Sequence, residues 1–315
     1  MDAEETAAGQ DSWRLPDWLE DRLLPDSRFA KAYGRFGDDS RALLKRTIAA
    51  HYALHAPSQS RSESSVVTLR SGLRQQRATR PADYAILLLD GPLDAPALTL
   101  AALMPLLTSG INEVLVVRLG SAASIPDSLL TACELAGQER FAALGPAQVE
   151  RLLVDCSHGG ADGVLLYAAT DAVRRVLDRP ALRRLLFSGS VRGSVRAVPL
   201  APPASVGLWR DGSGQFPAEP LALLYAGLSI AAAGQAPGTR STKVAVAKAD
   251  AAWSAFAAQG HEVLFVPDGR LAAVLNTTAT NARVVVAESQ LGLWHWPGLT
   301  PNLFMQSTVA FSSAR

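Results

Sequence analysis

Two short apolar runs near the middle of the chain most constrain its fold. Residues 84–89 read YAILLL and residues 114–117 read VLVV, without a charged residue in either. Runs of this length are typical of strands that are buried on both faces of a parallel sheet. The segments 96–108 and 128–136 have the spacing of helices. Strands that alternate with helices in this way predict an α/β fold with right-handed crossovers.

The pattern continues along the chain. Strands are expected at 164–167 and 185–188, and a helix at 221–232. A second run of alternating elements follows, with strands at 243–247, 262–266 and 283–287 and helices at 250–259 and 270–275. The prediction is a Rossmann-like doubly wound parallel sheet with a second, smaller α/β domain.

Helical spacing within 15–55 predicts a helical N-terminal arm, which serves either as a cap or as a dimer contact, and the Ser-rich stretch 57–65 reads as a linker. We therefore expect an arm and linker at 1–65, a Rossmann-like nucleotide-binding domain at 66–235, and a shortened second α/β domain with a C-terminal tail at 236–315. The 315 residues also allow one large α/β domain.

The charges are balanced overall but unevenly placed. Thirty basic and 29 acidic side chains give a net charge of +1, so the chain lacks the field that would hold nucleic acid or an anionic membrane. Residues 1–39 carry ten acidic and five basic groups, whereas residues 40–80 carry one acidic and eight basic groups. These two segments are expected to attract each other within one chain or between the subunits of a homodimer.

Two cysteines, Cys133 and Cys156, cannot build a disulfide framework, and no Cys-x-x-Cys pair is present to hold zinc. The acidic start of the chain lacks the features of a secretory signal, and no apolar run reaches the ~18 to 20 residues of a membrane span. The expected location is the cytoplasm.

No Gly-x-Gly-x-x-Gly motif follows the first strand. The loop FSGSVRG at 187–193 follows an expected strand, and its small residues would let backbone N–H groups approach a phosphate. An ordinary turn between a strand and a helix explains the same residues.

Cys156 and His158 could form a thiolate and its base, because a neighbouring imidazolium lowers the pKa of a thiol. The alternative is a buried cysteine beside a loop histidine. The five histidines contain no HExxH-like motif, so the sequence predicts no zinc site.

Several stretches together resemble the histidinol dehydrogenase and aldehyde dehydrogenase superfamily. The helix that starts at Pro96 and the helix SLLTACELAG at 128–137 are similar to helices of the histidinol dehydrogenase nucleotide domain. The turn LGPAQ at 144–148 and the segments PNL at 301–303 and VAFSS at 309–313 resemble further histidinol dehydrogenase motifs, and FSGSVRG resembles an aldehyde dehydrogenase motif. The resemblance covers roughly residues 83 to 313, with a gap, and it implies a dehydrogenase fold.

The chain departs from the superfamily at the positions that carry its chemistry. Residues 229–234 read SIAAAG where the resemblance implies two zinc ligands, and Leu303 stands in place of a histidine. Pro237 stands in the loop that bears the nucleophilic cysteine of aldehyde dehydrogenases. Alcohol oxidation of this kind needs a metal or a base, and aldehyde oxidation needs a thiolate. The resemblance therefore implies that neither parent mechanism operates, and no zinc is expected.

The resemblance implies that the nucleotide site of the superfamily is retained in this chain. It implies contacts between NAD or NADP and five residues: Gln148, Ser188, Gly189, Ser190 and Gly193. The same residues would also persist in an empty scaffold that needs tight turns. Three functions follow as hypotheses: a divergent NAD(P)-binding protein without the parent activity, an oxidoreductase whose chemistry has moved to Cys156 and His158, and a non-catalytic partner subunit.

Overall fold

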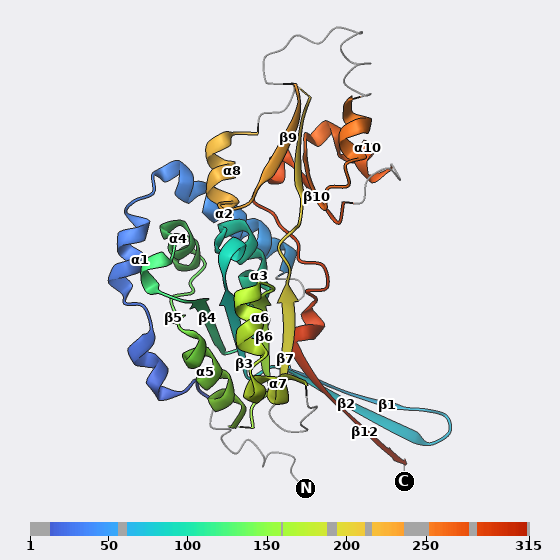
Figure 1. Cartoon of the computed structure of the whole chain (residues 1–315). Coiled ribbons are helices and arrows are strands. Elements are labelled where there is room, and N and C mark those ends of the chain that lie inside the picture. The colour runs from blue at the N-terminus through green and yellow to red at the C-terminus, as the bar shows by residue number, and fades with distance from the viewer. Residues whose placement is uncertain are drawn as a thin grey trace.

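The computed structural model describes residues 13–55, 62–158, 160–187, 194–211, 216–235, 252–276 and 282–313. These residues form two lobes and one projecting arm (Figure 1). The larger lobe contains a five-stranded sheet, the smaller lobe a four-stranded sheet, and the arm a three-stranded sheet. Among the described residues, no helix is long and apolar enough to cross a membrane.

The larger sheet is parallel throughout, and its hydrogen-bonded order is β5-β4-β3-β6-β7. Its strands are β3 (Tyr84–Leu89), β4 (Glu113–Leu119), β5 (Phe141–Leu144), β6 (Gly163–Ala168) and β7 (Val195–Leu200). This order corresponds to strands 3-2-1-4-5 of the doubly wound nucleotide-binding topology. Every residue of β3 is buried, as the run YAILLL predicts. The expected Rossmann-like sheet is confirmed.

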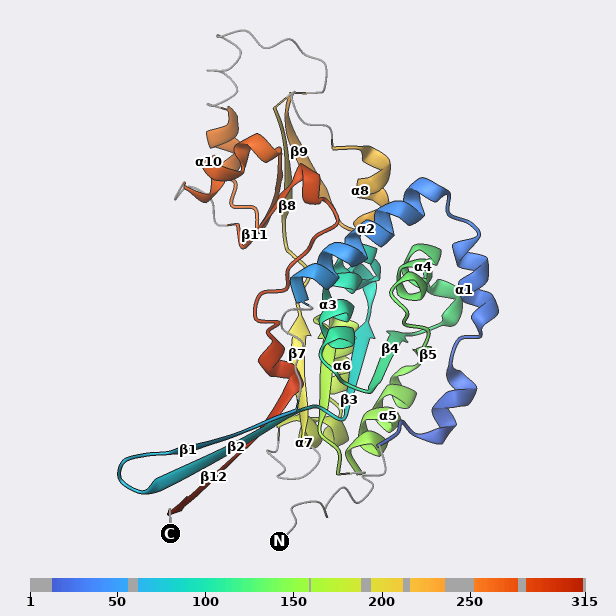
Figure 2. The same cartoon turned by 180° about the vertical axis from the view of Figure 1, so that it is seen from behind.

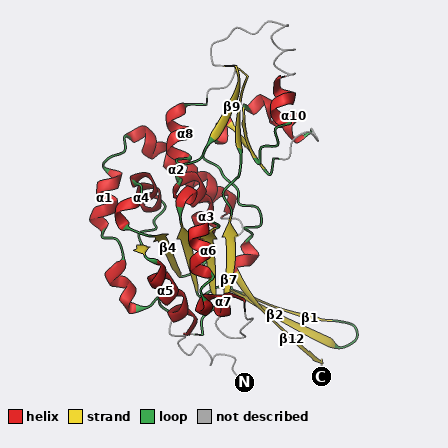
Figure 3. Ribbon diagram, in the orientation of Figure 1, coloured by secondary structure: helices red, strands yellow, loops and turns green. Residues whose placement is uncertain are grey.

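Helices cover the larger sheet on both sides (Figure 3). The helices α3 (Pro96–Thr108) and α4 (Asp127–Leu135) contact each other, and α5 (Pro146–His158) contacts α6 (Asp171–Leu177) and α7 (Pro180–Phe187). The strand expected at 185–188 is wrong, because α7 occupies this segment. Leu182, Leu185 and Leu186 have helical spacing, and Pro180 stands at the first position of the helix, where proline is favoured.

The N-terminal helices form a cap on the chain's own larger lobe. They are η1 (Asp17–Arg22), α1 (Asp26–Tyr33) and α2 (Asp38–His55), of which α1 contacts α4 and α2 contacts α3. Their apolar side chains Leu19, Phe29 and Leu44 are buried in the main core. The sequence allows these helices to be a cap or a dimer contact, and in the structure they cap the larger lobe.

The smaller lobe is a second parallel sheet in the order β11-β10-β8-β9. Its strands are β8 (Val206–Asp211), β9 (Ile230–Gln235), β10 (Val263–Val266) and β11 (Val284–Ala287), and its helices are α8 (Ala218–Leu224), 252–257 and α10 (Leu271–Leu275). Part of the lobe has its own apolar cluster around Trp209, Trp253 and Phe256.

Two expectations for the smaller lobe differ from the structure. The helix expected at 221–232 ends at Leu224, because Gly227 turns the chain with a φ of 82° and β9 follows. The expected boundary at residue 235 falls inside the lobe, because β8 and β9 both precede it and pair within the smaller sheet. The strand expected at 243–247 lies outside the described residues.

The arm is an antiparallel sheet in the order β1-β2-β12, and it extends away from the body (Figure 2). Its strands are β1 (Glu63–Thr68), β2 (Leu73–Pro81) and β12 (Met305–Ser313). The expected linker at 57–65 therefore runs into a strand. Paired residues share a face of the sheet, and the register places five exposed apolar side chains on one face. This apolar arm face consists of Val67, Leu69, Leu73, Val309 and Phe311.

His51 is fully buried on α2. One turn earlier on the same helix, Thr47 packs against Gly292 from the C-terminal part of the chain. The pKa of His51 is lowered to about 4, mainly by burial and to a smaller extent by the charge of His55. The folded protein therefore resists protonation at this side chain between about pH 6.5 and pH 4, whereas the unfolded chain binds the proton.

We expect the free energy of unfolding to fall by up to about 3 kcal/mol as the pH drops through this window, because protons bind preferentially to the unfolded chain. Urea unfolding at pH 7, 5.5 and 4.5 measures the effect. His51→Leu should flatten the dependence, and the exposed His158→Gln should leave it unchanged. An identical pH dependence in His51→Leu and the original protein would contradict the assignment.

Candidate functional site

The carboxyl edge of the five-stranded sheet is where its topology favours a ligand site. The strand order reverses between β3 and β6, and in open α/β sheets ligands bind in the crevice at such a switch point. The strand β3 leads into Asp90 and the short helix η3 (Gly91–Asp94). The strand β6 leads into Thr170, whose side chain accepts a hydrogen bond from the backbone of α6.

Four polar side chains form a connected cluster at this switch point. The Arg118 guanidinium, from the end of β4, lies 3.1 Å from Asp90 through Nη1 and 2.7 Å from Asp94 through Nε. The hydroxyl of Thr170 donates to the second carboxylate oxygen of Asp90 at 2.6 Å. The three charged side chains retain between 12% and 19% of their exposure. Burial raises the pKa of Asp94, and the charge of Arg118 opposes this rise.

The cluster does not fit a pyrophosphate group. Two carboxylates and one guanidinium leave one net negative charge when all are ionised, which repels a phosphate. The start of α3 offers no anion cradle either, since Pro96 lacks an N–H and Ala97 and Leu98 are fully buried. Carboxylate and hydroxyl groups are instead suitable partners for the hydroxyls of a ribose.

Sequence reasoning missed this cluster. The available signal was positional: Asp90 directly follows YAILLL, and Arg118 directly follows VLVV. Polar residues at the carboxyl ends of neighbouring parallel strands meet at one edge of the sheet. The pairing between β3 and β6, which brings Thr170 to Asp90, is not visible in the local pattern.

Gln148 lies at the carboxyl edge after β5, in the first turn of α5. Its side-chain oxygen accepts a hydrogen bond from the backbone N–H of Gly145 at 2.9 Å. A glutamine that reaches back in this way to the residue before the helix satisfies an N–H that the helix leaves unpaired. The structure thus gives Gln148 a capping role, and contact with a cofactor stays a prediction.

The other four expected cofactor contacts, Ser188, Gly189, Ser190 and Gly193, lie outside the described residues. The elements on either side are α7, which ends at Phe187, and β7, which begins at Val195. Ser194 donates to the carboxylate of Asp162, one residue before the start of β6. Ser194 and the start of β7 therefore lie at the amino edge of the sheet, opposite the switch point. The expectation that this loop follows a strand is wrong.

Cys156 and His158 both lie in the last turns of α5. Residues two apart on a helix are separated by about 200°, so their side chains point in nearly opposite directions. Cys156 is fully buried and His158 is exposed. Burial raises the pKa of the Cys156 thiol to about 12, and burial does the same for Cys133. The structure does not bring Cys156 and His158 together as a nucleophile and its base.

The positions of the implied zinc ligands fall on β9, apart from Ser229, which directly precedes it. Within the described ranges, no group of three or more His, Cys, Asp or Glu side chains is arranged to hold a metal ion. Gly234 on β9 has a φ of 93°, and a Cβ there would lie 1.9 Å from the carbonyl oxygen of Arg210. This position therefore requires glycine for packing.

No protein-family model and no curated protein sequence matches the chain. Among solved structures it is similar to histidinol dehydrogenase from Elizabethkingia anophelis, with 12% identity, 93% of this chain and 77% of that chain covered, and a TM-score of 0.52. An NAD-dependent benzaldehyde dehydrogenase from Corynebacterium glutamicum is 7% identical, with coverages of 91% and 86% and a TM-score of 0.39. The similarity to histidinol dehydrogenase confirms the resemblance seen in the sequence at the level of the fold.

Proposed function

We propose that this chain is a dehydrogenase-fold protein that binds a nucleotide, NAD or NADP, and does not carry out the parent oxidation. The burial of its thiols is the main observation behind the loss of activity. Both thiols are buried, and burial raises the pKa of each to about 12, which disfavours the thiolate that aldehyde oxidation requires.

The nucleotide half of the proposal is supported by the strand order and by the hydroxyl-binding character of the switch point. Asp90 and Thr170 would contact the ribose, because a carboxylate at this edge accepts hydrogen bonds from ribose hydroxyls. The negative charge of the cluster opposes phosphate, so the expected affinity is low, with a Kd of roughly 1 mM.

Calorimetry with NAD and NADP tests the nucleotide site. We expect one weak site per chain, and Asp90→Asn should weaken binding about tenfold, because it removes a charge-assisted hydrogen bond to the ribose. Asp178→Asn, an exposed change at the end of α6, is the matched control. The absence of heat with either nucleotide at several millimolar would remove this half of the proposal.

Thiol titration tests the other half. Ellman's reagent at pH 8 should label neither cysteine within minutes in the native protein and both in urea, because both thiols are buried. No NADH should form with alcohols or aldehydes. The competing hypothesis of relocated chemistry at Cys156 and His158 predicts a reactive native thiol and a turnover that Cys156→Ser abolishes.

A role as a non-catalytic subunit is the second candidate, and the apolar arm face favours it. Phe311 is 65% exposed on this face, and Val67, which is 50% exposed, lies on the same face at the far side of Gln75. Nothing in the described part of the chain covers this apolar side, and a sheet of three strands needs such packing for stability. The β1–β2 hairpin also carries four arginines against one glutamate, while η1 and the start of α1 are acidic. We propose that the arm contacts a second copy of the chain.

A further inference from the structure

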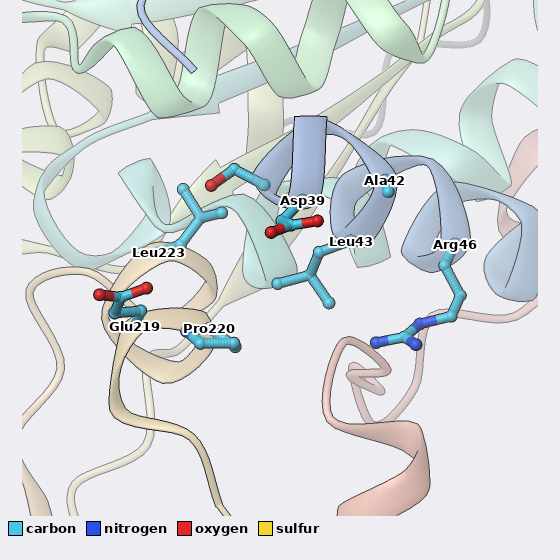
Figure 4. A pocket seen from close by; sticks show the side chains of 8 residues that line it. Asp39, Ala42, Leu43, Arg46, Glu219, Pro220 and Leu223 are labelled. Atoms are coloured by element: carbon cyan, nitrogen blue, oxygen red, sulfur yellow. The ribbon is translucent and has the colours of Figure 1, made fainter. Parts of the chain in front are cut away.

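A cavity of about 420 Å³ lies between α2 of the N-terminal cap and α8 of the smaller lobe (Figure 4). This volume is within the range of pockets that hold small molecules. The cavity is separate from the switch-point cluster, and it is called the α2–α8 pocket below. A smaller cavity of about 130 Å³ lies on the other side of Arg46, which lines both.

The pocket has apolar walls and a charged rim. Leu43 from α2 faces Pro220 and Leu223 from α8, which gives an aliphatic surface across the middle. Glu219 and Arg46 stand toward opposite ends of this surface in Figure 4, and Asp39 lies between them along α2. An elongated ligand that lies across the aliphatic surface would therefore meet charges at both ends.

The three charged side chains have no ion pair or hydrogen bond with any part of the chain that the structure describes. In contrast, Arg41 on the same helix pairs with Asp38 and lies over the ring of Tyr33. Asp39 and Arg46 are seven residues apart, which places them on one helix face about 10 Å apart, too far for a direct pair. Among the residues that the structure describes, the rim thus presents two exposed carboxylates and one exposed guanidinium without a charged partner.

We propose that the α2–α8 pocket binds a basic amino acid of the lysine and ornithine class. Such a ligand carries two ammonium groups and one carboxylate, which match the two carboxylates and one guanidinium of the rim one to one. The ligand carboxylate pairs with Arg46, because a guanidinium binds carboxylates with two parallel hydrogen bonds. The ammonium groups pair with Asp39 and Glu219, and the aliphatic chain lies on Leu43, Pro220 and Leu223.

The rim carboxylates could also serve helix stability alone, and the experiment must distinguish this role from ligand binding. Asp39 and Glu219 both lie in the first turn of their helices, where a negative charge stabilises the helix dipole without any ligand. That explanation accounts for neither the unpaired Arg46 nor the cavity. It predicts that Asp39→Asn changes thermal stability to the same extent with and without lysine.

Calorimetry with the full chain tests the proposal, using L-lysine, L-ornithine and the truncated analogue 1,5-diaminopentane, which lacks the carboxylate. We expect lysine to bind with a Kd at or below about 1 mM and the diamine to bind more weakly. Arg46→Gln should weaken lysine about fivefold and leave the diamine unchanged, whereas Glu219→Gln should weaken both. Arg41→Gln, whose side chain is paired elsewhere on α2, is the control.

Two results would overturn the proposal. The first is the absence of lysine binding at 10 times the expected Kd. The second is lysine binding that Asp39→Asn, Arg46→Gln and Glu219→Gln all leave unchanged, which would place the ligand elsewhere. Thermal unfolding provides a second readout, because lysine should raise the midpoint of the original protein more than that of Arg46→Gln at the same concentration.

Discussion

Gly163→Ala should destabilise the protein by about 3 kcal/mol or more, because the new methyl group has no space. Gly163 begins β6 directly opposite Tyr84 of β3. A Cβ at this position would lie 2.2 Å from Cζ of the Tyr84 ring and 2.4 Å from Cε2. The ring cannot move aside easily, since it is fully buried and stacks on Trp13 at a centroid distance of 4.4 Å. Urea unfolding measures the loss.

The matched control is the exposed Gly269→Ala, where a Cβ meets nothing within 4 Å, and its effect should stay within about 0.5 kcal/mol. The double variant Gly163→Ala/Tyr84→Ala tests the cause. If the clash with the ring is responsible, the double variant should lose less stability than the sum of the two single changes. Additive losses would show that the glycine acts in another way.

Phe311→Asp should convert a dimer into a monomer at micromolar concentration. The proposed contact between arms or between an arm and a neighbouring body buries the apolar arm face, of which Phe311 is the most exposed member at 65%. Removing a central aromatic side chain from an interface typically costs 2 kcal/mol or more, and a buried unpaired carboxylate adds to this loss, so we expect at least about a 30-fold weaker association. Light scattering across a concentration series measures the mass.

Ser312→Asp is the control for this prediction, because the neighbouring residue on β12 points to the opposite face of the arm and pairs with Arg74 in the register. It should leave the mass unchanged. A monomeric original protein at every concentration would remove the proposed self-association, and a dimer that survives Phe311→Asp would place the interface elsewhere on the molecule.

Much of the larger lobe could be predicted from sequence because its signals are local. YAILLL and VLVV are strands with both faces buried, so a continuous apolar run is enough to predict them. The boundary between the two lobes is less visible in the sequence. The alanines of SIAAAG favour a helix, and the strand forms because the segment pairs with β8.

The candidate site was less predictable for a related reason. The Asp90, Asp94, Arg118 and Thr170 cluster depends on which strands are neighbours, and strand order is a property of the whole sheet. Cys156 and His158 illustrate the opposite case, because they are close in sequence but their side chains lie apart. The helix turns one of them into the core and the other toward solvent.

The arm links distant parts of the chain: β2 is its central strand, and the contact between Arg77 and Ser307 joins residues 230 positions apart. During synthesis the β1–β2 hairpin is therefore made long before β12, the third strand of its sheet. At typical ribosome speeds the wait is about 10 to 45 s, during which one edge of β2 is open to other strands. Until β12 is made, this open edge is a place where the arm can pair with the wrong chain.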